Sequence, residues 1–100
     1  MSKALITDKE YIRFEDIIFK VRRVYEFGKN EFTQAETEHI NKVFEQLTAE
    51  HPRECKIIVR HHLKRVYYTT MAREQNVSEG YIRKLAKNGA YYFLQLYDKK

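Results

Sequence analysis

Four residues near the middle of the chain have side chains of the kind that bind zinc. His51 and Cys55 lie four positions apart, and His61 and His62 follow. However, His51 precedes Pro52 and is expected outside the helix that carries Cys55, while neighbouring histidines on a helix point about 100° apart. No CxxC or HxxxH spacing occurs in the sequence. Because zinc ligands must converge on one ion, we expect no metal site and predict Cys55 and His62 to be core residues.

Signatures of catalysis are also missing from the sequence. It contains no GxSxG nucleophile elbow, no P-loop and no dinucleotide-binding glycine fingerprint. Acidic pairs such as Glu15 and Asp16 are expected on a helix surface, with no cleft to act in. We therefore predict that the protein is not an enzyme and needs no cofactor.

The stretch 67–97 has the order of residues that a helix-turn-helix requires. Met71 and Ala72 form a small apolar side in a first short helix. Asn76 follows where the turn needs a residue that tolerates a positive φ. Val77 then fills the corner between the helices, and Ser78 is a good N-cap because its hydroxyl accepts an amide hydrogen of the first turn. This order predicts a second helix that begins near Glu79.

The predicted second helix has an apolar side and a basic side. Its apolar stripe, at 100° per residue, consists of Ile82, Leu85, Ala86, Gly89, Tyr92, Phe93 and Leu96. Its other side carries Gly80, Arg83, Lys84, Lys87 and Tyr91. A solvated basic face is common on helices, but a helix of this kind after a tight turn is also suited to a DNA major groove.

The composition favours a single small domain, and the charge distribution favours one that binds a polyanion. The 100 residues are 43% hydrophobic and 33% charged, which favours folding over disorder. Residues 1–50 carry 8 basic and 10 acidic side chains, whereas residues 51–100 carry 11 and 4, so the net charges are −2 and +7. We interpret 51–100 as a basic DNA-reading part and 1–50 as a helical pair that supports it or faces a partner.

Local signals along the chain predict an all-α protein, a compact bundle of about five helices with a C-terminal helix-turn-helix. Thr7 or Asp8 caps a first helix that runs to Phe27 and is ended by Gly28-Lys29-Asn30. Thr33 and Glu36 form a capping box for a second helix that stops near His51. A third helix is expected from Arg53 to Arg65, with Ile57 on its outer side. The first helix is apolar on two sides, because Ile12 and Phe19 lie opposite its main stripe; burial between neighbours and a partner-binding patch are both open.

No segment predicts a membrane or secreted protein. No apolar stretch approaches the length of a bilayer span, and MSKALITDKE lacks the apolar region of a signal peptide. The single cysteine cannot form an internal disulfide, which fits a reducing compartment. These features predict a cytoplasmic location.

From about Val43 onward the sequence resembles a known family. The runs EQLTAEHPRECKIIVRHHL, YYTTMARE and NVSEGYIRKL are similar to the promoter-reading domain of bacterial sigma factors (region 4), and more so to the small ArpU-like regulators of phages and mobile elements. Leu47, Pro52-Arg53-Glu54 and Ile58 match the family's opening, Met71-Ala72 its first helix, and Val77-Ser78 with Ile82-Arg83 its second. The resemblance implies a DNA-binding transcriptional regulator that acts with RNA polymerase.

These observations define the expected site and its alternatives. The residues expected at duplex DNA are Thr69, Thr70, Arg73, Ser78, Glu79, Gly80, Tyr81, Arg83, Lys84, Lys87 and Tyr91. A homodimer or RNA polymerase is expected as partner, because one reading helix binds weakly alone. The alternative is a protein-interaction module that binds polymerase or a sigma factor without reading DNA, since Glu79 and Gly80 replace bulkier polar residues of the family. A phage packaging or replication protein also stays open.

Overall fold

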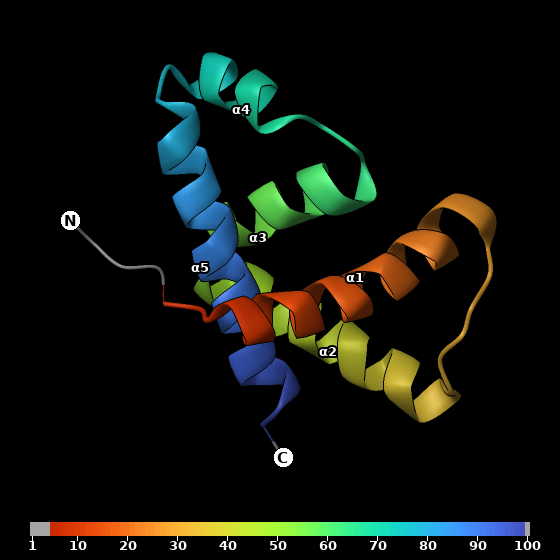
Figure 1. Cartoon of the computed structure of the whole chain (residues 1–100). Coiled ribbons are helices and arrows are strands. Elements are labelled where there is room, and N and C mark those ends of the chain that lie inside the picture. Colours follow the sequence, from red (N-terminus) through yellow and green to blue (C-terminus); the bar gives the residue numbers. More distant parts are fainter. Residues whose placement is uncertain (1–4, 100) are drawn as a thin grey trace.

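The computed structural model describes residues 5–99. Within this range the regular secondary structure is helical, and no strand occurs (Figure 1). The elements in order are α1 (Asp8–Phe27), α2 (Gln34–Glu50), α3 (Pro52–Ile58), the π-helix η1 (Val59–Leu63), α4 (Tyr68–Gln75) and α5 (Glu79–Tyr97). The radius of gyration of 13.5 Å is that of a compact chain of this length. The predicted all-α bundle of five α-helices is confirmed.

The second helix begins at its predicted capping box, and the first begins at Thr7, one of its two predicted caps. Thr7 Oγ1 accepts from the backbone amide of Glu10 at 3.2 Å, and Glu10 Oε1 accepts from the amide of Thr7 at 2.9 Å. Thr33 and Glu36 form the same reciprocal pair at 3.1 and 2.9 Å. Gly28 ends α1 with a left-handed φ of 69°. These capping boxes satisfy amide groups that a helix start leaves without partners, which is why local sequence located both starts.

The third helix differs from its prediction. An α-helix was expected from Arg53 to Arg65, but α3 ends at Ile58 and continues as the wider π-turn of η1 to Leu63. The amide of Lys64 donates to the carbonyl of Val59, five residues back, at 3.2 Å. Arg65 then takes a positive φ of 56°, which turns the chain toward α4. The end of this helix therefore depends on the path to α4 rather than on a local stop signal.

Ile57 was predicted to point outward and is instead only 2% exposed. The prediction assumed one buried face for this helix. The structure packs α3 against α5, and places Ile57 and Met71 of α4 in the same groove. Because neighbours lie on two sides of α3, both its faces belong to the core.

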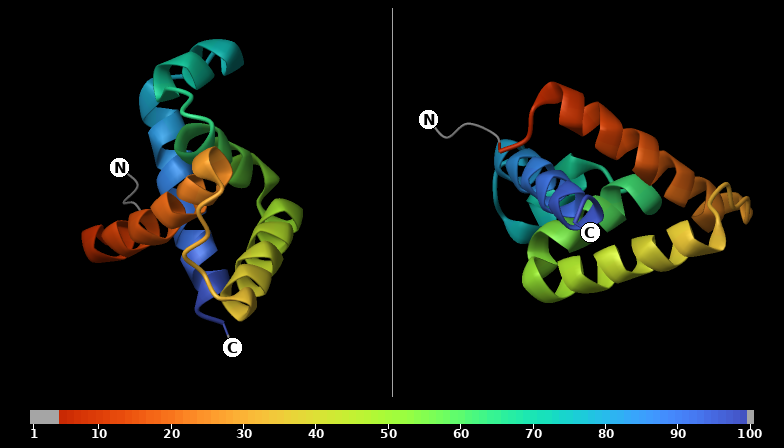
Figure 2. Two further views of the ribbon diagram at one scale, coloured as in Figure 1. Left: turned by 90° about the vertical axis from the view of Figure 1, so that its right-hand side faces the viewer. Right: turned by 90° about the horizontal axis from the view of Figure 1, so that it is seen from below.

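Helix α5 is the central element, since α1, α2, α3 and α4 all pack against it. The fully buried Phe93 meets Phe14 of α1 edge-on at 5.4 Å and Phe44 of α2 at 5.3 Å between ring centroids. Gly89 lets α3 approach closely, because a Cβ there would lie 3.1 Å from the carbonyl oxygen of Glu54, which is tighter than an ordinary contact. Viewed from below, α1 and α2 diverge from their loop and α5 lies between their open ends (Figure 2).

The buried stripe of α5 is wider than predicted. Ile82, Leu85, Ala86, Gly89 and Phe93 are buried as expected, Tyr92 and Leu96 are half-buried, and Ala90 and Leu94 are buried although they were not predicted. Helical periodicity predicts a single apolar stripe that packs against the core. Here helices cover α5 from several directions, so positions on the flank of the stripe are buried as well.

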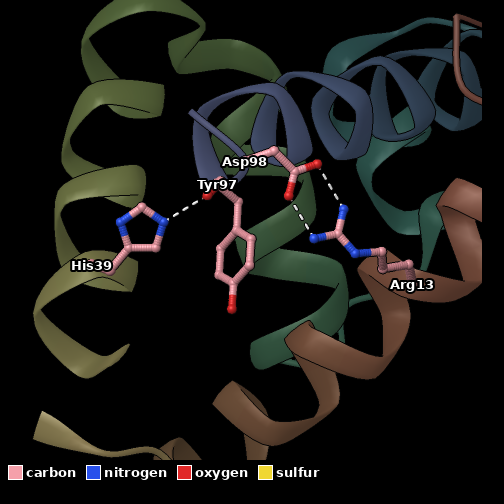
Figure 3. A network of polar contacts seen from close by, with 4 residues as sticks. All are labelled: Arg13, His39, Tyr97 and Asp98. Carbon is pink, nitrogen blue, oxygen red and sulfur yellow. Dashed lines mark hydrogen bonds and ion pairs between the residues drawn. The ribbon is translucent and has the colours of Figure 1, made fainter. Parts of the chain in front are cut away.

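Polar contacts hold the C-terminal end of α5 to the first two helices (Figure 3). Arg13 of α1 donates to both carboxylate oxygens of Asp98, at 2.7 and 2.5 Å. His39 Nε2 of α2 lies 2.7 Å from the carbonyl oxygen of Tyr97 and donates to it. The guanidinium keeps the pKa of Asp98 below its usual range. The residues 1–50 and the basic part are thus joined by both apolar and polar contacts.

The apolar residues on the two sides of α1 differ in how deeply they are buried. Phe14 and Ile18 are fully buried, whereas Ile12 is 59% exposed. Phe19 is half-buried beneath the guanidinium of Arg22, 4.7 Å from its ring centroid. The helix is therefore not enclosed on both sides at its N-terminal half. None of the helices described between residues 5 and 99 is long and apolar enough to cross a bilayer.

Candidate nucleic-acid interface

Helices α4 and α5 form the predicted helix-turn-helix arrangement through residues 76–78. Asn76 has φ 56° and ψ 46°, the left-handed conformation expected of it. The amide of Val77 donates to the carbonyl of Ala72 at 3.0 Å, which closes the end of α4. Ser78 Oγ accepts from the amide of Tyr81 at 3.1 Å and so caps α5. With Met71 and Ala72 buried, the two helices are held at a defined angle by local hydrogen bonds and a small apolar contact.

The outer side of α5 presents cations near its N-terminus. Lys84 and Lys87 are exposed, and neither forms an ion pair with another residue in the range 5–99. Gly80 is exposed between them and the turn, and Tyr81 is 38% exposed. Tyr91 is half-buried against the core and is less available than predicted. The two lysines therefore offer unneutralised charge on a rigid helix.

Arg83 is restrained rather than free. Its Nε donates to Glu79 Oε2 at 2.7 Å, one helical turn earlier. Its guanidinium also lies 4.9 Å from the ring centroid of Tyr68, which is buried at the start of α4. The Glu79 carboxylate raises the pKa of Arg83 further above its usual range. Arg83 is thus held over α4, and an anion at this site must compete with Glu79.

The three residues of α4 that were expected to contact DNA lie in two environments. Thr69 and Arg73 are exposed, and Thr70 is half-buried. Arg73 forms no ion pair with any residue that the structure describes. A hydroxyl and a free guanidinium on the helix before the turn are groups that bind phosphate oxygens.

A second basic cluster, which was not predicted, lies on α3 and η1. Arg53 donates to Tyr81 Oη at 3.1 Å and to Gln75 Oε1 at 3.2 Å, and its guanidinium lies 5.2 Å from the Tyr81 ring centroid. Arg60 makes a bidentate pair with Glu74 at 2.7 and 3.2 Å. The spacing of 53, 56 and 60 along one helix face could have indicated this cluster. Contact with α5 could not be inferred, because it joins residues 28 positions apart.

The zinc-type residues have separate structural roles. His51 stacks on Tyr92 at 3.6 Å between ring centroids, and Cys55 is buried with its Sγ 3.4 Å from Thr48 Oγ1. Burial raises the pKa of the Cys55 thiol. Burial, reinforced by His61 and Arg22, lowers the pKa of His62 to about 4. Over residues 5–99 no three metal-ligating side chains gather to hold an ion.

His62 is buried as predicted, and one of its two ring nitrogens has no polar partner within residues 5–99. Its Nε2 is buried with no hydrogen-bond partner among the described residues. The ring instead meets Phe14 edge-on at 5.4 Å. The neutral imidazole therefore packs as an aromatic group in the core.

An apolar hollow lies at the other end of the molecule, between α1, α2 and η1. It has a volume of about 220 Å³ and is lined mainly by Val21, Val24, Tyr25, Phe32, Ile40 and Leu63. Tyr25, which lines the hollow, is 59% exposed, and Phe27, the last residue of α1, is 67% exposed. Asn30 uses its side chain locally, since its Oδ1 accepts from the amide of Phe32 at 2.9 Å. The hollow therefore presents apolar carbon rather than charge.

Comparison with known proteins leaves the site to be interpreted from its own geometry. No known protein family, no curated protein and no solved structure matches the chain.

Proposed function

We propose that this protein is a transcriptional regulator that binds duplex DNA through α4 and α5 and acts with RNA polymerase in the cytoplasm. The observation that carries the proposal is the rigid turn at residues 76–78 beside three cations without carboxylate partners among residues 5–99: Arg73, Lys84 and Lys87. Charge of this kind on the two helices of a turn attracts phosphates and steers α5 toward a major groove.

In the proposed complex, the side chains of α5 contact the groove and those of α4 contact the DNA backbone. Lys84 and Lys87 face the groove and its phosphates, and Thr69 and Arg73 contact the backbone on the side of α4. Arg83 contacts a base edge or a phosphate when it leaves Glu79. The resemblance of residues from Val43 onward to sigma region 4 supports polymerase as the partner.

The experiment is a duplex-binding measurement at several salt concentrations, together with genome-wide binding of the tagged protein in its host. A DNA reader neutralises phosphates, so its affinity should fall steeply with salt. Replacing Arg83 and Lys84 by alanine should abolish discrete genomic sites. Recovery of polymerase without such sites, and without any effect of the two substitutions, would contradict the proposal.

A second candidate function is supported by the apolar hollow. Tyr25 in its lining, Phe27 exposed at the end of α1, and Glu79 at the tip of α5 favour a protein-interaction module that binds polymerase or a sigma factor without DNA. Apolar contact resists salt. Partner binding that persists at high salt and is lost on Tyr25→Ser/Phe27→Ser, in a protein that binds no duplex, would establish this alternative.

A further inference from the structure

A polar groove separates α3 and η1 from α4. Its volume is about 360 Å³. Arg53, Lys56 and Arg60 line one wall, and Glu74 and Gln75 line the other. Ile57 and Met71, both almost fully buried, form the floor. The groove therefore combines charged walls with an apolar floor, which excludes water from one side of any ion bound there.

The charges of this groove are unequal. It holds three cations and a single carboxylate. Glu74 neutralises Arg60 through their bidentate pair. Lys56 is exposed and has no carboxylate within ion-pair distance among residues 5–99. The groove is thus left with an excess of two positive charges at neutral pH.

Arg53 is the second uncompensated cation, because its partners are neutral. It donates to the phenol of Tyr81 and to the amide oxygen of Gln75. Neutral acceptors hold a guanidinium more weakly than an anion does, so an anion can displace them. Guanidinium and ammonium groups side by side suit a phosphate, which accepts several hydrogen bonds at once.

The groove also borders the start of α5. Tyr81 lies in the first turn of α5, and Gln75 is the last residue of α4. Both contact Arg53, so the groove ends where the proposed DNA-binding helix begins. None of the four residues assigned to DNA above (Lys84, Lys87, Thr69 and Arg73) lines this groove.

We propose that the groove between α3 and α4 is a phosphate-binding site, with Lys56 and Arg53 as its main cations and Glu74 as the group that limits its affinity. The phosphate has two sources: the backbone of duplex DNA, or a free phosphorylated molecule. The first source rests on the proposed function, whereas the second does not.

The first arm of the test uses inorganic pyrophosphate and backbone amide resonances measured by NMR. Saturable shifts are expected at 53, 56, 60 and 75. Lys56→Ala should weaken binding by up to about five-fold, the effect of one partly exposed ion pair. Glu74→Gln should strengthen it by a similar factor, because Arg60 is released. Lys42→Ala removes the same charge from the exposed surface of α2 and serves as the matched control.

The second arm measures how duplex affinity depends on salt. Loss of one phosphate contact makes the negative slope of log affinity against log salt less steep by about 0.9, so Lys56→Ala should show this change and Lys42→Ala should not. A less steep slope identifies the DNA backbone as the source. Pyrophosphate binding with an unchanged slope identifies a free phosphate.

The outcomes separate this inference from the proposed function. If the protein binds duplex, but Lys56→Ala changes neither the slope nor the pyrophosphate shifts, the phosphate site is overturned. If the protein binds no duplex, the proposed function fails and the pyrophosphate arm alone decides. Circular dichroism melting of each variant identifies any that loses its fold, and Glu74→Gln remains informative because its expected effect is a gain.

Discussion

Two helix pairs in this protein are built by the same local rules and present opposite surfaces. The α1–α2 connection begins with Gly28 at φ 69° and ends with Thr33 as a cap. The α4–α5 connection begins with Asn76 at φ 56° and ends with Ser78 as a cap. The first pair surrounds an apolar hollow, whereas the second displays lysines. Backbone chemistry thus defines the turns, and the side chains beside them define what each pair can bind.

The largest expected effect tests whether the two pairs are one cooperative unit. Phe93 of α5 contacts Phe14 of α1 and Phe44 of α2. Phe93→Ala should lower the free energy of unfolding by about 3–5 kcal/mol, because it opens a cavity between them. Urea titrations followed by circular dichroism and tyrosine fluorescence should give one coincident transition. Gln95→Ala, on an exposed position of α5, should change stability by less than about 0.5 kcal/mol. Two separate transitions would mean that the pairs fold independently.

Acid should destabilise the fold by protonating His62 of η1, which packs against Phe14 of α1 in the core. The pKa of His62 is lowered to about 4 from an ordinary 6.5, so the unfolded chain takes up a proton there before the folded chain does. Stability should therefore fall as pH drops from about 6.5 to 4, by about 3 kcal/mol in total. The check is the free energy of unfolding against pH for the wild type and for His62→Leu. Parallel profiles for the two proteins would contradict this role of His62.

Duplex binding should distinguish the surfaces of the two pairs. Lys84→Ala/Lys87→Ala should lower duplex affinity about tenfold. It should also make the negative slope of log affinity against log salt less steep by about 1.8, since two phosphate contacts are lost. Tyr25→Ser/Phe27→Ser, at the exposed C-terminal end of α1, should leave both values unchanged. Fluorescence anisotropy with labelled duplex measures them. Equal losses in the two double variants would show that the assigned surface is wrong.

The two caps provide a matched comparison of stability. Ser78→Ala and Thr33→Ala should each cost about 1 kcal/mol, because each removes a side-chain acceptor from a helix start. Only Ser78→Ala should also weaken duplex binding, since it loosens the start of α5. Thermal melting and anisotropy on the same samples give both quantities. An equal loss of DNA affinity in Thr33→Ala would imply that duplex binding reports only overall stability.

The smallest expected effect concerns the ion pair at the tip of α5. Glu79→Gln removes the carboxylate that holds Arg83 at 2.7 Å. Duplex affinity should rise by about three-fold, because the substitution removes a carboxylate that the DNA phosphates repel and releases Arg83. Glu50→Gln, at the exposed end of α2, is the control for total charge. A fall in affinity for Glu79→Gln would instead indicate that Glu79 itself accepts a hydrogen bond from DNA.

Local features of the fold were predictable because they depend on neighbouring residues. The cap at Thr7, the capping box at Thr33, the positive φ of Asn76 and the cap at Ser78 all follow from side-chain and backbone chemistry within four positions. The exposed positions of Lys84 and Lys87 followed from helical periodicity. Their function remains a proposal, since exposure is also the default for lysine.

What the sequence alone determined is where the helices start, where the two turns lie and which half is basic. Tertiary structure decided the rest. It buried Ile57, Ala90 and Leu94 by bringing more than one helix against α3 and α5, and it widened the end of α3 into a π-turn. It also joined Arg53 to Tyr81 across 28 positions of sequence. The physical reason is that capping and periodicity act within one or two turns of chain, whereas burial and long-range ion contacts depend on which helices meet.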